Sequence, residues 1–76
     1  MTELHSEEYR RFADALVVAR QAAGLTQREL GHRLGKDHTY VTKYEGRVRR
    51  LDVVEFLQIM AALNADPHDL IRQLKL

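Results

Sequence analysis

Residues 36–50 of the chain combine a helical pattern with many side chains that donate or accept hydrogen bonds. At about 100° per residue, a helix over this segment has one mainly apolar side and one polar side. The apolar side carries Tyr40, Val41 and Tyr44. The polar side carries His38, Thr39, Thr42 and Lys43. We expect the first side to pack on a core and the second to face a partner molecule.

The polar groups are of kinds that can reach base edges in the major groove of DNA, which is wide enough to admit a helix. Lys43 can donate to guanine O6 or N7, the Thr39 methyl can contact thymine, and His38 can donate to a purine N7. Basic side chains around the segment would contact phosphates without reading sequence. They are Arg28, Lys36, Arg47, Arg49 and Arg50.

Plainer interpretations of these residues remain open. The polar side could be a solvated helix face, and the arginine run could be a solvated loop. Tyr40 and Tyr44 suit core and edge packing better than base stacking, although the Tyr40 hydroxyl could reach a phosphate. The four histidines share no i,i+4 spacing and cysteine is absent, so we expect no metal site. Since no activated nucleophile or phosphate-cradling glycine loop is visible, we expect neither an enzyme nor a cofactor.

Composition and charge restrict the class of protein. The 76 residues, 45% hydrophobic and 30% charged, predict one globular domain over residues 1–76. No membrane span or signal peptide is visible, and the lack of cysteine favours a reducing cytoplasm. The net charge of +1 divides into −2 for residues 1–19, +5 for residues 20–50 and −2 for residues 51–76. A basic middle between acidic ends suits a polyanion that docks at one place.

Capping residues and apolar stripes predict five helices and no strand. Capping boxes begin two helices, T-Q-R-E at 26–29 and D-V-V-E at 52–55. Asp37 and Asp66 are suitable N-caps, and Gly24 is a suitable left-handed stop. The expected helices are 6–23, 26–35, 37–45, 52–63 and 67–74. Their predicted core stripes are Tyr9, Phe12, Leu16, Ala19 and Ala23 in the first helix and Val53, Phe56, Met60 and Leu63 in the fourth.

The second and third expected helices are joined by only L-G-K, residues 34–36. A tight glycine-containing turn between short helices favours the steeply crossed helix-turn-helix unit, here over about residues 26–45. Gly31 supports this, because a glycine inside a helix costs about 1 kcal/mol relative to alanine and often marks close approach of another backbone. We therefore expect the third helix to cross the second near Gly31.

The segment Q-R-E-L-G-H-R-L-G-K-D-H-T-Y-V-T-K-Y resembles the helix-turn-helix of the phage repressor and Cro (XRE-type) DNA-binding family. The T-Q-x-E-L opening, the small residue at 31, Gly35 and the inward Val41 stand at that family's spacing. The resemblance extends from about Phe12 to Leu70. It implies a compact five-helix, lambda-repressor-like domain in which Gln27 braces the third helix and touches a phosphate. The base-reading positions that it implies are His38, Thr39 and Lys43, with Thr42 beside them.

The resemblance also implies a partner for Arg20, whose charge interrupts the first apolar stripe and would be costly unpaired. That partner is Glu45, and we expect the pair to fix the third helix against the first. Two places depart from the family pattern. Lys36 stands where an aliphatic residue is usually buried. Gly46 comes one position early and Arg47 takes the usual glycine's place, so either Gly46 ends the helix sooner or Arg47 is left-handed.

These observations predict a small transcriptional regulator that binds double-stranded DNA sequence-specifically and represses by occupying its operator. One alternative is the antitoxin or restriction-controller class, which shares the fold. Another is a helical adaptor that binds protein through its C-terminal apolar surface. That surface contains Leu70, Ile71, Leu74 and Leu76. We expect Leu70 to help close the core, and the remainder would form either a homodimer seam or a frayed tail. A dimer predicts a pseudo-palindromic operator with half-sites about one helical turn apart.

Overall fold

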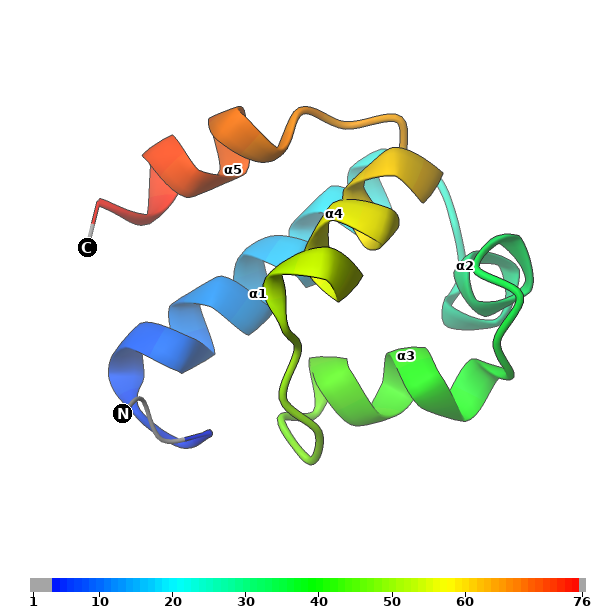
Figure 1. Cartoon of the computed structure of the whole chain (residues 1–76), viewed down its shortest axis with the longest axis horizontal. Helices are drawn as coiled ribbons and strands as arrows, with labels where there is room; N and C mark the ends of the chain where they lie inside the picture. The colour runs from blue at the N-terminus through cyan, green and yellow to red at the C-terminus, as the bar shows by residue number, and fades with distance from the viewer. Residues whose placement is uncertain (1–3, 76) are drawn as a thin grey trace.

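The structure is a computed structural model that describes residues 4–75, so Leu76 of the predicted seam lies outside the described residues. Within that range the chain forms five α-helices and no strand, which confirms the predicted all-α class. The helices are α1 (Glu7–Ala22), α2 (Gln27–Arg33), α3 (His38–Glu45), α4 (Val53–Ala62) and α5 (Pro67–Leu74). Figure 1 shows α3 along the lower edge of the molecule, with α5 along the upper edge.

The helices begin at the predicted capping residues. The Thr26 hydroxyl accepts from the Glu29 amide, and the Glu29 carboxylate accepts from the Thr26 amide, so the first capping box is complete. Asp52 and Glu55 make the same reciprocal pair at the start of α4. Asp37 caps α3, where its carboxylate accepts a backbone amide at 2.6 Å. These local hydrogen bonds satisfy amides that the helix itself leaves unpaired.

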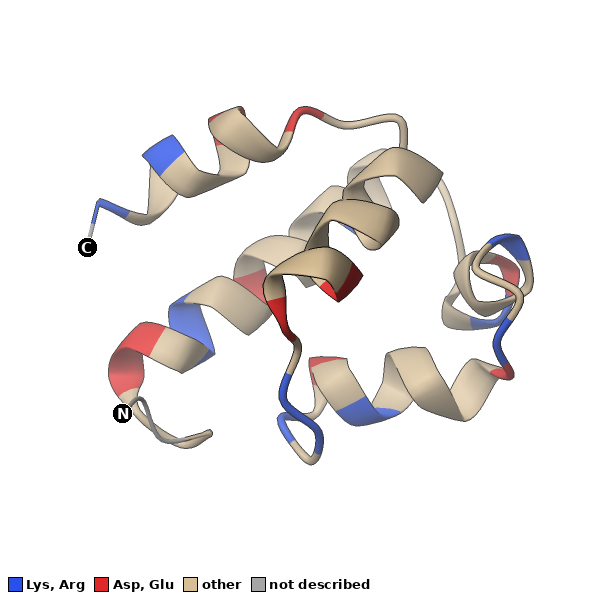
Figure 2. Cartoon of the chain, viewed as in Figure 1, with Lys and Arg blue, Asp and Glu red and all other residues tan. Residues whose placement is uncertain are grey.

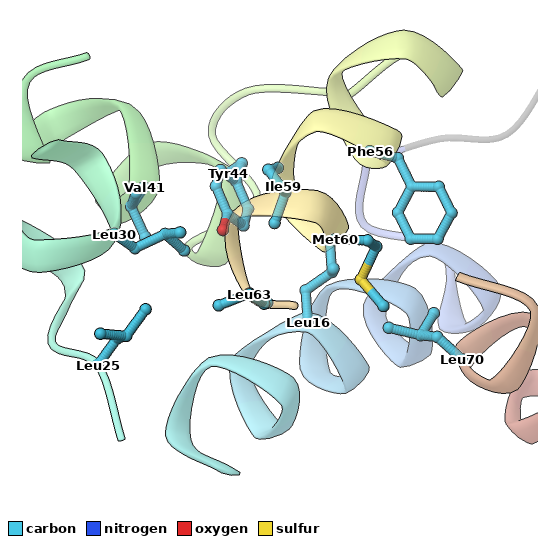
Figure 3. Packing of buried hydrophobic residues seen from close by; sticks show 10 residues of the cluster. All are labelled: Leu16, Leu25, Leu30, Val41, Tyr44, Phe56, Ile59, Met60, Leu63 and Leu70. Carbon is cyan, nitrogen blue, oxygen red and sulfur yellow. The ribbon is translucent and has the colours of Figure 1, made fainter. Parts of the chain in front are cut away.

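The core lies between α1, α4 and the inner faces of α2 and α3. Figure 3 shows Met60 of α4 beside Leu16 of α1, with Leu70 of α5 on one side of them. The largest fully buried side chains are Tyr44, Leu16, Leu30, Ile59, Met60 and Val41. Burying each large apolar side chain contributes about 1.5–3 kcal/mol, so this cluster holds the helix-turn-helix onto the rest of the molecule.

Two residues of the predicted stripes lie outside the core. Val53 is 71% exposed, because it occupies the first position of α4 and the core-facing residues start at Phe56. Ala23 is exposed because it is the C-cap of α1. The core instead includes Ala13 and Ile59, which are 2% and 0% exposed.

The α2 and α3 helices cross steeply, and Figure 1 shows α2 nearly end-on while α3 lies along the picture. A Cβ added at Gly31 would lie 3.1 Å from the Asp37 carbonyl oxygen and 3.2 Å from the His38 Cα. This confirms the predicted close approach at Gly31. The turn between the helices also contains Gly35, whose φ of 69° is the left-handed conformation that glycine adopts without strain.

Candidate DNA-binding surface

The two faces of α3 have different surroundings. Val41 and Tyr44 are 0% and 1% exposed, and they hold one face of α3 on the core. The four predicted base-reading side chains are all exposed: His38, Thr39, Thr42 and Lys43. Because the inner face is fixed by packing, the direction in which the outer face points is fixed as well.

The hydroxyl groups on the outer face already make local hydrogen bonds. Thr39 Oγ1 donates to Asp37 Oδ1 at 2.5 Å, which leaves the Thr39 methyl as the group it presents. Thr42 Oγ1 lies 3.0 Å from Gln27 Oε1 and 3.1 Å from the His38 carbonyl oxygen. Within residues 4–75, no hydrogen bond engages the Lys43 amine or the His38 ring, so these two retain their full capacity to donate.

A chain of polar side chains, which we call the brace, joins α1, α2 and α3. Arg20 Nε donates to Glu45 Oε2 at 2.7 Å, and Arg20 Nη2 donates to Glu45 Oε1 at 3.2 Å. Gln27 Nε2 donates to Glu45 Oε1 at 2.8 Å, and Gln27 in turn accepts from Thr42. Arg20 Nη1 also donates to the Leu25 carbonyl oxygen at 2.7 Å. The brace therefore comprises Arg20, Glu45, Gln27 and Thr42, and it contains the ion pair that the family resemblance implies.

The ion pair of the brace is largely shielded from water. The Arg20 and Glu45 side chains are 12% and 6% exposed. A shielded pair adds little net stability, but removing one partner strands the other charge and costs up to about 3–5 kcal/mol. The Gln27 side chain is used inside the brace, and its contact with a DNA phosphate stays a prediction.

Two conformations were considered for the end of α3, an early helix end at Gly46 and a left-handed Arg47, and the structure has the left-handed Arg47. Gly46 has φ −81°, whereas Arg47 has φ 59° and is left-handed. The backbone amides of Val48 and Arg49 both donate to the Lys43 carbonyl oxygen, at 2.9 and 3.2 Å. The loop that carries Arg47, Arg49 and Arg50 is thus fixed to the last turn of α3.

Three charged side chains, those of Lys36, Arg49 and Glu55, lie around Tyr40. The Arg49 guanidinium lies 4.9 Å and the Lys36 amine 5.6 Å from the centre of the Tyr40 ring. Arg49 Nη2 donates to Glu55 Oε2 at 2.5 Å, and the Tyr40 hydroxyl lies 3.4 Å from the same oxygen. The Arg49 guanidinium holds the pKa of the Glu55 carboxyl below its usual value. Three predicted phosphate contacts, Lys36, Tyr40 and Arg49, are thereby brought together at the Tyr40 ring, and Tyr40 and Arg49 also share the Glu55 carboxylate.

The remaining predicted phosphate contacts are more separate. Arg50 is exposed, and its guanidinium lies 5.9 Å from the centre of the Tyr9 ring on α1. The Tyr9 hydroxyl accepts from the Leu51 amide at 3.0 Å, which ties the end of the loop to α1. Arg28 is exposed on α2. In Figure 2, blue ribbon marks the turn before α3, one segment within α3 and the loop after it.

Neither a metal-ion site nor a membrane-spanning helix is found in the part of the chain that the structure describes. Residues 4–75 contain no group of three His, Asp or Glu side chains placed to hold a metal ion. No described helix is long and apolar enough to cross a membrane.

Two features were missed by the sequence predictions. Glu55 was assigned only to a capping box, yet it also binds Arg49, and only the spacing of opposite charges at 49 and 55 hinted at this. Val54 and Leu57 on α4 are 63% and 47% exposed and were not assigned to any surface. An apolar side chain outside the core stripe was the available signal for them.

Comparison with known proteins assigns the family. The model of the helix-turn-helix domain family matches residues 11–74. A solved structure of an XRE-family like protein from Pseudomonas syringae pv. tomato str. DC3000 is 42% identical, with a TM-score of 0.87. The match covers 93% of this chain and 87% of that one. The chain belongs to the XRE helix-turn-helix family.

Other solved XRE-like folds are more distant in sequence. Two mutants of the restriction-modification controller protein C.Esp1396I are each 22% identical, with TM-scores of 0.83 and 0.82. They are matched over 91% and 96% of this chain and over 92% and 90% of their own chains. At this identity the likeness shows the fold alone. No curated protein matches the chain significantly. Membership of the XRE family makes this a DNA-binding helix-turn-helix protein rather than an enzyme.

Proposed function

We propose that this protein is a cytoplasmic transcriptional regulator that recognises a specific DNA operator and represses by occupying it. The observation that carries the proposal is the outer face of α3. It presents His38 and Lys43 with no side-chain hydrogen-bond partner among residues 4–75, while the brace and the buried inner face hold the helix in one orientation. A helix with fixed orientation and unused donors is what direct reading of the major groove requires.

In this proposal the contacts divide into two kinds. The base-reading residues are His38, Thr39, Thr42 and Lys43. The residues that contact phosphates are Gln27, Arg28, Lys36, Tyr40, Arg47, Arg49 and Arg50. The phosphate contacts set register and orientation on the duplex, whereas the base contacts set sequence preference. Thr39 contributes its methyl group, because its hydroxyl is bonded to Asp37.

Selection of bound duplexes from a random pool tests the proposal most directly. A regulator of this kind enriches one sequence, and its affinity for that sequence falls steeply between about 50 and 200 mM salt. Recovery of unenriched DNA, or binding that salt leaves unchanged, would argue against operator recognition. The same outcome would favour the helical adaptor, which needs no DNA.

We further propose that two copies bind the operator together through an apolar surface on α4 and α5. Val53, Leu57 and Ile71 are 71%, 47% and 55% exposed, and Val54 beside them is 63% exposed. A hollow of about 210 Å³ next to them is lined mainly by Phe12, Leu51, Val53, Phe56 and Ile71. Val53 of α4 and Ile71 of α5 line this hollow together, and exposed apolar surface that gathers in one place is typical of interaction sites. The seam predicted from the last helix alone is therefore extended to α4.

A symmetric dimer requires a pseudo-palindromic operator, with half-sites about one helical turn apart. Sedimentation equilibrium measures the number of protein copies per particle, for the protein alone and for the protein with the selected duplex. Only monomers in both samples, or a selected sequence without symmetry, would exclude the dimer while leaving DNA recognition in place.

A further inference from the structure

The Glu55 carboxylate has more partners than its capping role requires. Its Oε1 accepts from the Asp52 amide at 3.0 Å, which completes the capping box of α4. Its Oε2 binds Arg49 at 2.5 Å and lies 3.4 Å from the Tyr40 hydroxyl. One oxygen therefore serves the helix start, and the other lies among groups of the DNA-binding surface.

The position of this second oxygen resembles that of a phosphate oxygen. An anion that accepts from an arginine and lies beside a tyrosine hydroxyl has the contacts expected of a DNA phosphate on the same groups. The Arg49 side chain is 40% exposed, so water and a second anion can reach it. Its Nη1 also donates to the Arg50 carbonyl oxygen at 3.2 Å, which orients the guanidinium plane.

We propose that Glu55 is an internal competitor for Arg49, which lowers the affinity of this surface for DNA phosphates of any sequence. The inference rests on the DNA-binding function proposed above. Arg49 and Glu55 together carry no net charge, so an approaching phosphate is attracted by the guanidinium and repelled by the carboxylate. When a phosphate binds the paired Arg49, fewer counterions are released from the DNA than when a phosphate binds an unpaired arginine.

The opposite role for Glu55 is also physically defined. If the carboxylate served mainly to hold Arg49 in its binding position, losing its charge would disorder the arginine and weaken DNA binding. The two roles therefore predict changes of opposite sign, which one substitution distinguishes.

The experiment is Glu55→Gln in the full chain, with binding measured on random-sequence duplex at several salt concentrations. Glutamine at the third helical position maintains a capping box, so helix α4 should begin as before. We expect affinity to rise roughly two- to fivefold, the size of a released surface ion pair. We expect the plot of log affinity against log salt to steepen by about 0.9, as for one added phosphate contact.

The decisive comparison repeats the Glu55→Gln substitution in a protein that already carries Arg49→Ala. The gain from Glu55→Gln should disappear in the double variant, because the group that was released is gone. Glu29→Gln is the matched control, since it removes the same charge from the other capping box without touching Arg49. Any general gain it causes should persist in the Arg49→Ala background.

The outcomes separate cleanly. An unchanged or weaker affinity for Glu55→Gln, or a gain that survives Arg49→Ala, would overturn the competitor role while the proposed function stood. Absence of duplex binding by the unaltered protein would overturn both. Circular dichroism and the melting temperature of each variant show that the fold is retained.

Discussion

The left-handed backbone conformation after α3 belongs to Arg47 and not to Gly46 beside it. The glycine has φ −81°, which any residue adopts, and the arginine next to it has φ 59°. A left-handed residue after a helix is usually glycine, because a side chain there costs about 1–2 kcal/mol. The chain therefore carries local strain at the start of its most basic loop.

Arg47→Gly should raise the free energy of unfolding by about 0.5–1 kcal/mol, because glycine adopts the left-handed conformation without strain. Asn64 has φ 58° at the end of α4 and provides the matched control. Asparagine tolerates this region, so Asn64→Gly should change stability much less. Urea denaturation measures both. Equal gains at the two positions would show that strain is not specific to the arginine.

Glu45→Gln should lower the free energy of unfolding by about 2 kcal/mol, because it leaves Arg20 shielded without a counter-charge. DNA affinity should fall as well, since the brace orients α3. Asp69→Asn removes one partner of the exposed Arg72–Asp69 pair and should cost less than about 0.5 kcal/mol. If Glu45→Gln left both melting temperature and affinity unchanged, the brace would have no orienting role.

Lys43→Ala should cost about 1–3 kcal/mol on the selected operator and relax its sequence preference, because Lys43 is proposed to read a base edge. Arg50→Ala should weaken operator and random DNA alike and reduce the salt slope by about one. Fluorescence anisotropy on both duplexes measures the difference. Equal losses on operator and random DNA for Lys43→Ala would remove it from the base-reading set.

Ile71→Glu should convert a dimer to a monomer, because it places a charge in the proposed apolar interface. Val18→Glu is the control, since Val18 is 62% exposed on α1 and does not line the hollow. Sedimentation equilibrium compares the two variants at the same concentration. A dimer that survives Ile71→Glu would place the interface elsewhere.

Tyr44→Phe should raise the free energy of unfolding by about 1 kcal/mol, because a buried hydroxyl without a partner costs stability. The Tyr44 hydroxyl has no hydrogen-bond partner among residues 4–75. Tyr9→Phe is the opposite control, because the Tyr9 hydroxyl accepts from the Leu51 amide. That substitution should cost about 1 kcal/mol.

Tyr44 should also make the free energy of unfolding depend on pH. Burial raises the pKa of Tyr44 well above its usual value of 10. Above pH 10 the unfolded chain releases this proton while the folded protein retains it, so stability falls as pH rises. Tyr44→Phe should make the fall above pH 10 shallower. Denaturant titrations at pH 8 to about 11 give the slope.

The sequence predicted the parts of the fold that depend on local chemistry. The boxes at Thr26 and Asp52 and the close approach at Gly31 follow from hydrogen bonding and sterics within a few residues. The outward position of Val53 could not be predicted, because it depends on how α4 is rotated about its own axis by packing. The helix period places Val53 in line with Phe56, but the core ends before it.

The parts of the candidate surface that depend on the helix period could be predicted, and the parts that depend on the path of a loop could not. The direction of the α3 face follows from the helix period, and the Arg20–Glu45 contact came only from the family resemblance. The Arg49–Glu55 contact depends on the path of the loop between α3 and α4, including the left-handed Arg47. No local pattern specifies that path.

The outer face of α3 makes no contribution to the core, and this separation has an evolutionary consequence. His38, Thr39 and Lys43 can each be exchanged without opening a cavity, because the stability of the helix comes from Val41, Tyr44 and the brace. If α3 reads operators as proposed, a lineage built on this scaffold can acquire new operators through a few surface substitutions. Duplicated regulators of this fold could then diverge in the DNA they bind while the fold of each stays the same.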